Sequence, residues 1–318
     1  MSASLTSGTE SDFVCDCEGW ARSACTAESF YKEHEDKRYC LLHYPGKEKS
    51  ADFKIALNRK LQNKDFDFAG VWFPDAVFFI GFDFRALASF YGATFSAAVD
   101  FSHATFSAEA NFGTTTFSAA DFSDATFNSA AYFSATTFNA LAYFRAATFS
   151  SLAYFRAANF SAAADFGSAT FSRAADFSAT TFGAAASFRS ATFTKAGNFS
   201  ATTFSAAASF RSATFTTAGD FISATFSAEA DFRDAIFNGA ANFSHAAFRD
   251  YVGFSGDEDR QVFSATSSLD LQFARIDKPD HVSFHTLLLR PHWFVNVDPR
   301  GFDFTNVNKC ELGLAQHS

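Results

Sequence analysis

Four cysteines and one histidine near the N-terminus are the residues best suited to metal chemistry: Cys15, Cys17, Cys25, Cys40 and His43. Thiolate and imidazole ligands suit tetrahedral Zn²⁺, and the spacing of Cys40-Leu-Leu-His43 lets both side chains reach one ion. Five candidates for four places leave the choice between Cys15 and Cys17 open. A short region with little core of its own would gain stability from such a site. We therefore predict one structural Zn²⁺, held by four of these five residues and closed to substrate.

The usual signatures of catalysis are absent from the rest of the sequence. The stretch from Gly253 to Gly256 is one residue too short for the nucleophile motif G-x-S-x-G. The pair His34-Glu35 lacks the second histidine of a zinc-protease helix, and no glycine-rich phosphate loop occurs. The other polar candidates are more typical of a solvated loop, structural histidines and an isolated thiol: 256–260, His281, His285, His292 and Cys310. We therefore expect no enzymatic activity.

The elements that must position these residues follow from the spacing of phenylalanine. From Phe68 to Phe254 phenylalanine recurs in alternating steps of five and six residues, 35 times in all, with one irregular step between Phe117 and Phe122. On a helix this series would drift over every face. Repetition of a short unit instead indicates a solenoid.

The physical repeat is 22 residues long. Residues 183–204 and 205–226 match at 16 of 22 positions, whereas an offset of eleven residues gives 4 matches in 11. Four phenylalanines per repeat predict a coil with four sides. Two residues before most of these Phe residues the side chain is small, and the residue between is mostly polar, so an extended side would bury both the small residue and the Phe. The irregular step lacks one Ala, a loss that a corner between sides tolerates.

The unit Ala175-Asp176-Phe177-Ser178-Ala179 and its many variants resemble the pentapeptide-repeat family, over roughly Phe66 to Phe254. The resemblance implies a right-handed, four-sided parallel β-helix. This chain departs from the simplest pattern by adding a residue to every second repeat and by using Phe where many members mix Leu and Phe. Its N-terminal stretch also resembles caps that precede repeats in uncharacterised bacterial pentapeptide proteins. We predict an all-β fold, a β-solenoid with a small N-terminal cap that contains a helix.

The sequence divides into three predicted regions: an N-terminal cap at 1–65, the repeat β-helix at 66–254, and degenerate coils with a C-terminal cap at 255–318. A solenoid needs caps because its end coils expose unpaired backbone groups. Ser50 is predicted to N-cap a helix that runs to about Asn63. Phe53, Leu57 and Leu61 would lie on one face of this helix and pack on the first coil.

Composition and charge exclude several classes of protein. No run of eighteen apolar residues predicts a transmembrane helix, and residues 1–12 lack the pattern of a secretory signal. Five cysteines, four of them before residue 41, do not form the framework of a disulfide-rich protein. The net charge of −9 is spread along the chain, so nothing indicates nucleic acid or an anionic membrane as a partner. We expect a cytoplasmic protein, of an oligomeric state that the sequence does not determine.

These features favour a non-enzymatic scaffold or protein-interaction module with an unknown protein partner. The family resemblance implies an alternative, a DNA-mimicking protein that binds a topoisomerase. Mimicry of about 40 Å of B-DNA needs about two dozen negative charges, whereas residues 68–254 hold 13 acidic and 9 basic side chains.

A minor alternative is an ice-binding face. Twelve of the fifteen residues that precede the second Phe of each unit, from Thr94 to Ala247, are threonine. The residue after that Phe is threonine only at Thr194 and Thr216, so the second row of a flat lattice would lack most of its methyl groups.

Overall fold

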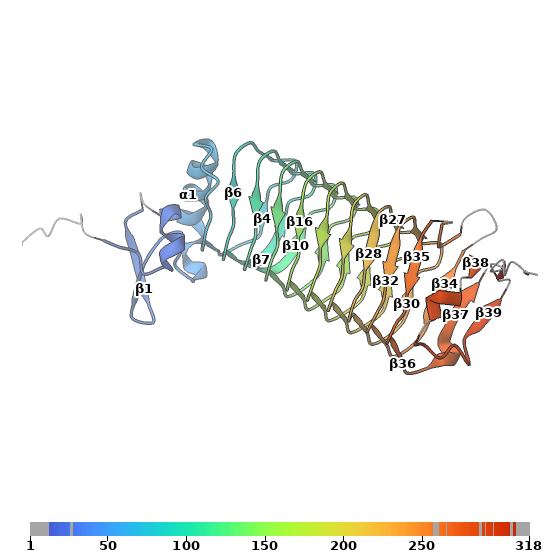
Figure 1. Cartoon of the computed structure of the whole chain (residues 1–318). Coiled ribbons are helices and arrows are strands. Elements are labelled where there is room, and N and C mark those ends of the chain that lie inside the picture. The colour runs from blue at the N-terminus through green and yellow to red at the C-terminus, as the bar shows by residue number, and fades with distance from the viewer. Residues whose placement is uncertain are drawn as a thin grey trace, which may run out of the picture.

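The repeat region winds into a four-sided parallel β-solenoid, as the phenylalanine spacing predicts (Figure 1). The computed structural model describes residues 13–25, 28–256, 261–264, 266–285, 288–289, 291–294, 296–305 and 308–309. The coils stack along one axis, with a helix-containing cap at the N-terminal end and broader strands at the C-terminal end. Among the described residues, no helix is long and apolar enough to cross a membrane.

Each side of a coil carries one short strand, which pairs in parallel with the equivalent strand of the next coil. We number the sides faces 1 to 4 in chain order. Face 1 contains β3 (Trp72–Phe73), the first part of β7 (Thr94–Asp100) and of β10 (Thr116–Asp121), β13 (Thr137–Phe138), β17 (Asn159–Phe160), β21 (Thr181–Phe182), β25 (Thr203–Phe204), β29 (Thr225–Phe226), β33 (Ala247–Phe248) and β36 (Arg275–Ile276). Face 3 contains β5 (Asp83–Phe84), β8 (Thr105–Phe106), β11 (Thr126–Phe127), β15 (Thr148–Phe149), β19 (Thr170–Phe171), β23 (Thr192–Phe193), β27 (Thr214–Phe215) and β31 (Ile236–Phe237). Both faces therefore present mainly threonine to solvent.

Faces 2 and 4 present aspartate, asparagine, serine and tyrosine instead. Face 2 contains β4 (Val77–Phe78), the last part of β7 and β10, β14 (Ala142–Tyr143), β18 (Ala164–Asp165), β22 (Ala186–Ser187), β26 (Ala208–Ser209), β30 (Ala230–Asp231), β34 (Val252–Ser255), β37 (Val282–His285) and β39 (Asp303–Thr305). Face 4 contains β6 (Ala88–Ser89), β9 (Ala110–Asn111), β12 (Ala131–Tyr132), β16 (Ala153–Tyr154), β20 (Ala175–Asp176), β24 (Gly197–Asn198), β28 (Ala218–Asp220), β32 (Ala240–Asn242) and β35 (Ser268–Asp270).

The core consists of four parallel stacks of phenylalanine. Every Phe of the series from Phe68 to Phe254 is at most 2% exposed, which confirms the predicted orientation. Within a stack the rings are nearly parallel, as for Phe144 and Phe166 at 4.7 Å between centroids. Rings of faces 2 and 4 meet edge to face across the axis, as for Phe133 and Phe144 at 5.3 Å. Each ring buries roughly 150 Å² or more, worth at most about 4 kcal/mol of transfer free energy.

The two kinds of step make two kinds of corner. Corners after faces 2 and 4 are tight turns, in which the second residue after Phe has a positive φ, such as His103 (φ 56°), and Ala104 N–H donates to Phe101 O at 3.0 Å. A left-handed conformation costs a non-glycine residue about 1–2 kcal/mol. A hydrogen bond from that residue to the next coil offsets this cost, as in Ala135 N–H to Arg156 O at 2.9 Å. Six-residue steps use the longer corners after faces 1 and 3.

The irregular step lies at a corner, which tolerates the missing residue, as predicted. Phe117 pairs with Phe95 and Asp121 pairs with Asp100, but the register shifts by one residue in between. Strands β7 and β10 consequently run across the corner from face 1 to face 2 without a break.

The N-terminal cap contains the 3-10 helix η2 (Gly19–Cys25), the hairpin β1 (Phe30–His34) and β2 (Lys37–Cys40), the 3-10 turn η3 (Lys47–Lys49) and helix α1 (Ser50–Gln62). The prediction that Ser50 N-caps α1 is wrong. Ser50 is the first helical residue, its Oγ donates to Lys47 O at 2.6 Å, and no side chain caps the helix, because η3 leads directly into it. Packing of α1 on the first coil is confirmed by Phe53, whose ring lies 5.4 Å from that of Phe73.

The C-terminal coils are less regular, and they add η4 (Pro279–His281), η5 (Pro291–Phe294) and the pair β38 (Leu288–Leu289) and β40 (Asn308–Lys309). Residues 1–12, 257–260 and Cys310 lie outside the described residues, as does the side chain of His292. The boundaries of the three predicted regions, at residues 65 and 254, stay a prediction.

Candidate metal centre

All five predicted ligands come together in the cap. Cys15 and Cys17 lie on the segment before η2, Cys25 ends η2, Cys40 ends β2, and His43 lies in the turn that follows β2. Cys15, Cys25, Cys40 and His43 are buried, and Cys17 is partly exposed. Residues up to 28 positions apart in sequence thus share one small interior.

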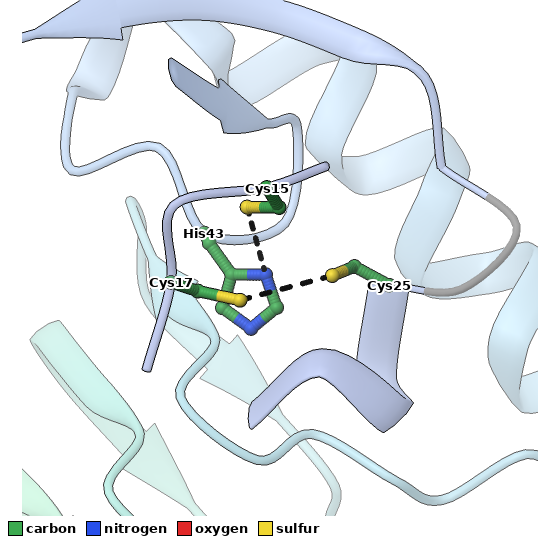
Figure 2. A group of neighbouring side chains, drawn as sticks. All are labelled: Cys15, Cys17, Cys25 and His43. Carbon is green, nitrogen blue, oxygen red and sulfur yellow. Dashed lines mark hydrogen bonds between the residues drawn. The ribbon is translucent and has the colours of Figure 1, made fainter. Parts of the chain in front are cut away.

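The donor atoms are close enough together to surround one metal ion after a small contraction. The donor atoms of Cys15, Cys17, Cys25 and His43 all lie within 4.8 Å of one another (Figure 2). Cys17 Sγ lies 3.9 Å from Cys25 Sγ, and Cys15 Sγ lies 3.9 Å from His43 Nδ1. Zn–S and Zn–N bonds of about 2.3 and 2.0 Å in a tetrahedron separate the ligand atoms by about 3.5 to 3.8 Å.

Cys40 supplies a fourth sulfur and a fifth candidate donor beside this group. Its Sγ lies 3.2 Å from His43 Nδ1, and its backbone N–H donates to Cys15 Sγ at 3.3 Å. The sequence leaves open whether Cys15 or Cys17 is a ligand, but both belong to the close group of four. The residue that is not a ligand could therefore be any of the five. Which four would bind a metal stays a prediction.

The segment that carries Cys15 and Cys17 is fixed to the hairpin by the residue between them. Asp16 N–H donates to Arg38 O at 2.8 Å, and Arg38 N–H donates to Asp16 Oδ2 at 2.7 Å. The sulfurs of Cys15 and Cys17 both belong to the close group of four donors. The sequence signal for this arrangement was the Cys-Asp-Cys spacing, but Arg38 could not be recognised from it.

The ring of His43 is oriented as a metal ligand requires. Its Nε2 lies 2.9 Å from Ala69 O. A carbonyl oxygen only accepts, so Nε2 carries the hydrogen and Nδ1 faces the sulfurs. Ligating histidines in metalloproteins show this same hydrogen bond to a backbone carbonyl or carboxylate.

The cluster favours a cation electrostatically. Hydrogen bonds from Cys25 and Cys40 hold the pKa of Cys15 well below its usual value, although burial raises it. Burial and the charge of Cys15 raise the pKa of Cys17 to about 12. Burial lowers the pKa of His43, but hydrogen bonds to Cys15 and Cys40 outweigh it and raise this pKa to about 9. A metal cation would take the place of the proton on Nδ1 and let further thiols ionise.

Lys49 supports the turn that carries His43 and was not recognised from the sequence. Its Nζ donates to Leu41 O and Leu42 O, each at 2.8 Å, and lies 4.7 Å from the ring centroid of Phe53. Burial lowers the pKa of Lys49 to about 7, against the charges of Cys40 and Cys15, which raise it. No sequence pattern distinguishes Lys49 from its neighbours Lys47 and Lys54.

The turn after β2 also closes the edge of the solenoid. Leu42 O accepts from Trp72 N–H at 3.1 Å, at the place where Val71 O accepts from Thr94 N–H one coil later. Together with His43 and Ala69, this bond joins the candidate metal ligands to faces 1 and 4 of the first coil. A metal that orders this turn would therefore order the exposed end of the β-ladder.

Of the other histidines singled out in the sequence, His281 and His285 each bind a different carboxylate, and the side chain of His292 lies outside the described residues. His281 Nδ1 pairs with Asp250 Oδ1 at 2.9 Å, and His285 Nε2 pairs with Asp303 Oδ2 at 2.8 Å. Each of these two histidines therefore has its own carboxylate partner.

Comparisons with known proteins identify the repeat but no activity. The sequence model described as "Pentapeptide repeats (9 copies)" matches residues 199–247, within the solenoid. A comparison with curated proteins finds no match. Among solved structures the chain is similar, at 16% identity, to a trypsin-treated variant of QnrB1, a plasmid-mediated fluoroquinolone resistance protein. That match covers 74% of this chain and 92% of that chain, and its TM-score of 0.15 supports no argument about shape or activity.

Proposed function

Because the chain is a pentapeptide-repeat protein, we propose that it acts without catalysis, as a rigid scaffold whose outer faces bind a protein partner. The continuous phenylalanine core carries this proposal. The rings of the series are at most 2% exposed and stacked from coil to coil, so the interior of the repeat region is filled by side chains. Only outward side chains remain to meet another molecule, and they stand in regular rows.

We assign the metal centre a structural role with Zn²⁺ as the ion. Four thiolates, or three thiolates with one imidazole, are donor sets that Zn²⁺ prefers, and four protein ligands leave no position for a substrate. The hydrogen bonds from this site to Ala69 and Trp72 support a role in closing the first coil. Buried, unpaired cysteines are consistent with a reducing compartment, and we propose the cytoplasm.

The charge pattern counts against the DNA-mimicking alternative. Arg233 pairs with Asp231 at 2.8 Å, and Arg211 lies 3.4 Å from Asp234, so acidic residues of face 2 and its corners are partly neutralised. A DNA mimic instead needs a continuous negative surface. We expect no inhibition of a topoisomerase by micromolar protein in a supercoiling assay. Inhibition that increases with protein concentration would favour the DNA-mimicking function over the scaffold function.

The scaffold proposal is tested by native capture with the full-length chain as bait. A protein partner should be retained in a fixed ratio, and its cross-links should fall on outward residues such as Thr148, Thr170 and Thr192. The matched control is the same bait with these three threonines replaced by glutamate, changes that leave the buried residues of the strands untouched. Failure to retain any partner in a fixed ratio, or a catalytic turnover that co-purifies with the chain, would contradict the proposal.

A further inference from the structure

Face 2 carries an unusual row of four side chains near the cap. Parallel pairing of β4, β7, β10 and β14 sets four outward residues side by side in the order Phe78, Asp100, Asp121 and Tyr143. These strands lie at the N-terminal end of the rod (Figure 1). An acidic pair is thus enclosed between two aromatic residues.

The row borders a hollow beside the corner that contains the irregular step. The corner before Asp121 is one residue shorter than the paired corner before Asp100. The hollow has a volume of about 250 Å³ and is lined by Phe78, Ala98, Val99, Asp100, Ala119, Ala120, Asp121, Leu141 and Tyr143. Its base is therefore small and apolar, and it can admit one large side chain.

The walls of the hollow are apolar groups in contact with solvent. Phe78 is 70% exposed, Leu141 is 43% exposed and Tyr143 is 38% exposed. Every phenylalanine of the repeat series, by contrast, is buried. Exposed apolar side chains that gather around a concavity mark a binding surface more often than isolated ones do.

The two carboxylates supply an unbalanced charge. Asp100 Oδ1 accepts from Ser102 N–H and Asp121 Oδ1 accepts from Ser123 N–H, each at 2.8 Å. Neither aspartate forms an ion pair within the part of the chain that the structure describes. Two like charges on paired strands repel each other, so a cation between them would be stabilising.

Another coil of the same face shows how such a carboxylate is neutralised elsewhere. Asp231 has Arg233 two residues later, and the guanidinium donates to both carboxylate oxygens at 2.8 Å. At the hollow the corresponding positions are Ser102 and Ser123. The cation that the chain provides for Asp231 is therefore not provided for Asp100 and Asp121.

We propose that this hollow binds an arginine side chain of the protein partner, an inference that rests on the proposed scaffold function. A guanidinium is flat, donates in several directions to two carboxylates, and stacks on aromatic rings. Asp100 and Asp121 would accept its hydrogen bonds while Phe78 and Tyr143 enclose it. The compact ammonium group of lysine would reach the charges but would not stack.

The test is an NMR titration of the full chain with the blocked peptide acetyl-Gly-Arg-Gly-amide. We expect saturable shifts of the Leu141 methyl groups and the Tyr143 ring. The double variant Asp100→Asn with Asp121→Asn should bind at least about tenfold more weakly, because charge-assisted hydrogen bonds are lost. Asparagine keeps the acceptor of the turn, as Asn111 and Asn198 do in other coils, so the variant should fold. The control Asp220→Asn, on face 4, should bind like the wild type.

Three results would overturn the proposal. They are equal shifts with acetyl-Gly-Gly-Gly-amide, equal shifts in the double variant, and equally tight binding of the lysine peptide. Native capture separates this inference from the scaffold function. If the double variant retains the partner as well as the wild type does, the hollow is not the docking site and the scaffold function stands. If no partner is retained, the scaffold function fails, and the arginine site is decided by the titration alone.

Discussion

Each central coil of the solenoid lies between two coils of nearly the same sequence, whereas the N-terminal cap meets a coil on one side only. In the coils, backbone pairing and ring stacking repeat every 22 residues, as between Thr170 and Thr192 and between Phe171 and Phe193. In the cap, single hydrogen bonds between residues far apart in the sequence hold the segments together, such as those between His43 and Ala69 and between Cys40 and Cys15. Stability in the first region comes from repetition, and in the second from a few unique contacts.

The two regions should therefore respond differently to destabilising substitutions. A defect in the core of the rod interrupts the stack on both sides and should affect several coils. A defect at the candidate metal centre should affect the cap and the first coil, because the ladders beyond Trp72 have their own partners. The following variants test this separation.

The largest effect is expected from a charge in the core. Phe188 is fully buried between Phe166 and Phe210, at 4.9 and 5.0 Å between centroids. Phe188→Asp should therefore cost several kcal/mol and disrupt neighbouring coils, since a lone buried carboxylate has no partner. Urea unfolding followed by circular dichroism measures the loss. Ser187→Asp, which faces outward on the same strand, is the control, and equal stability of the two variants would contradict the inward stacks.

Loss of the metal should unfold the cap but not the rod. We expect about one equivalent of zinc per chain by elemental analysis, and we expect Cys25→Ser to abolish it, because Cys25 lies within the close group of four donors. Amide hydrogen exchange should then become faster at residues 13–25 and 28–65 of the cap. The β-sheet signal of the repeats in circular dichroism should persist.

Single serine variants of all five candidate ligands would define the site. Four of the variants should lose the zinc and one should keep it, which identifies the residue that is not a ligand. A protein purified without added metal that contains no zinc and has a fully ordered cap would disprove the site.

Contact between the cap and the first coil can be perturbed at one glycine. Gly70 has φ +66°, and a Cβ there would lie 2.6 Å from Ala21 Cβ and 3.3 Å from the His43 ring. Gly70→Ala should destabilise the junction between the cap and the first coil. The clash should add about 1–3 kcal/mol to the cost of placing alanine at a positive φ. Gly81→Ala is a matched control, because Gly81 has φ +63° and nothing within 4 Å of the added Cβ. Equal melting temperatures of the two variants would argue against a tightly docked cap.

A small effect of pH is expected within the rod. Burial raises the pKa of Asp231, but hydrogen bonds from the side chain and backbone of Arg233 outweigh it and lower this pKa below 3.8. The stabilisation is therefore complete above about pH 4 and is lost as the pH falls through the lowered value. Because Arg233 contacts water, the loss should stay below about 1 kcal/mol.

Urea unfolding of the wild type and Asp231→Asn between pH 5 and pH 2 measures this contribution. The difference in stability between the two proteins should shrink as the pH falls. A difference that grows towards low pH would mean that the ion pair does not stabilise the folded state.

Much of the rod could be predicted from the sequence because its rule is local. Strand alternation places each Phe and the small residue two before it on the same side, and this holds from coil to coil. Some interior details were not predictable from the pattern. Thr115 and Thr136 replace the small residue and are fully buried, and each Oγ1 donates to a Phe carbonyl at 2.6 Å. A hydroxyl is tolerated at this buried position because a backbone carbonyl oxygen of the preceding coil accepts its hydrogen bond.

The candidate metal centre was predictable as a set of residues but not as a geometry. Side chains that can bind zinc are recognisable by type, and their spacing in the sequence limits which of them can meet. Their convergence depends on Asp16, Arg38 and Lys49, which act through backbone groups of distant segments. No local pattern records such contacts.

The 22-residue coil, the inward phenylalanines and the position of the irregular step can all be read from the amino-acid sequence, because each follows from alternation and repetition along the chain. Only the tertiary structure decided that the two cysteines of the Cys-Asp-Cys segment both join the candidate ligands. It also decided that a hollow lies at the shortened corner, bordered by an acidic pair and two exposed aromatic residues. These features arise where segments far apart in the sequence, or successive coils, come into contact, and a contact of that kind depends on the path of the whole chain.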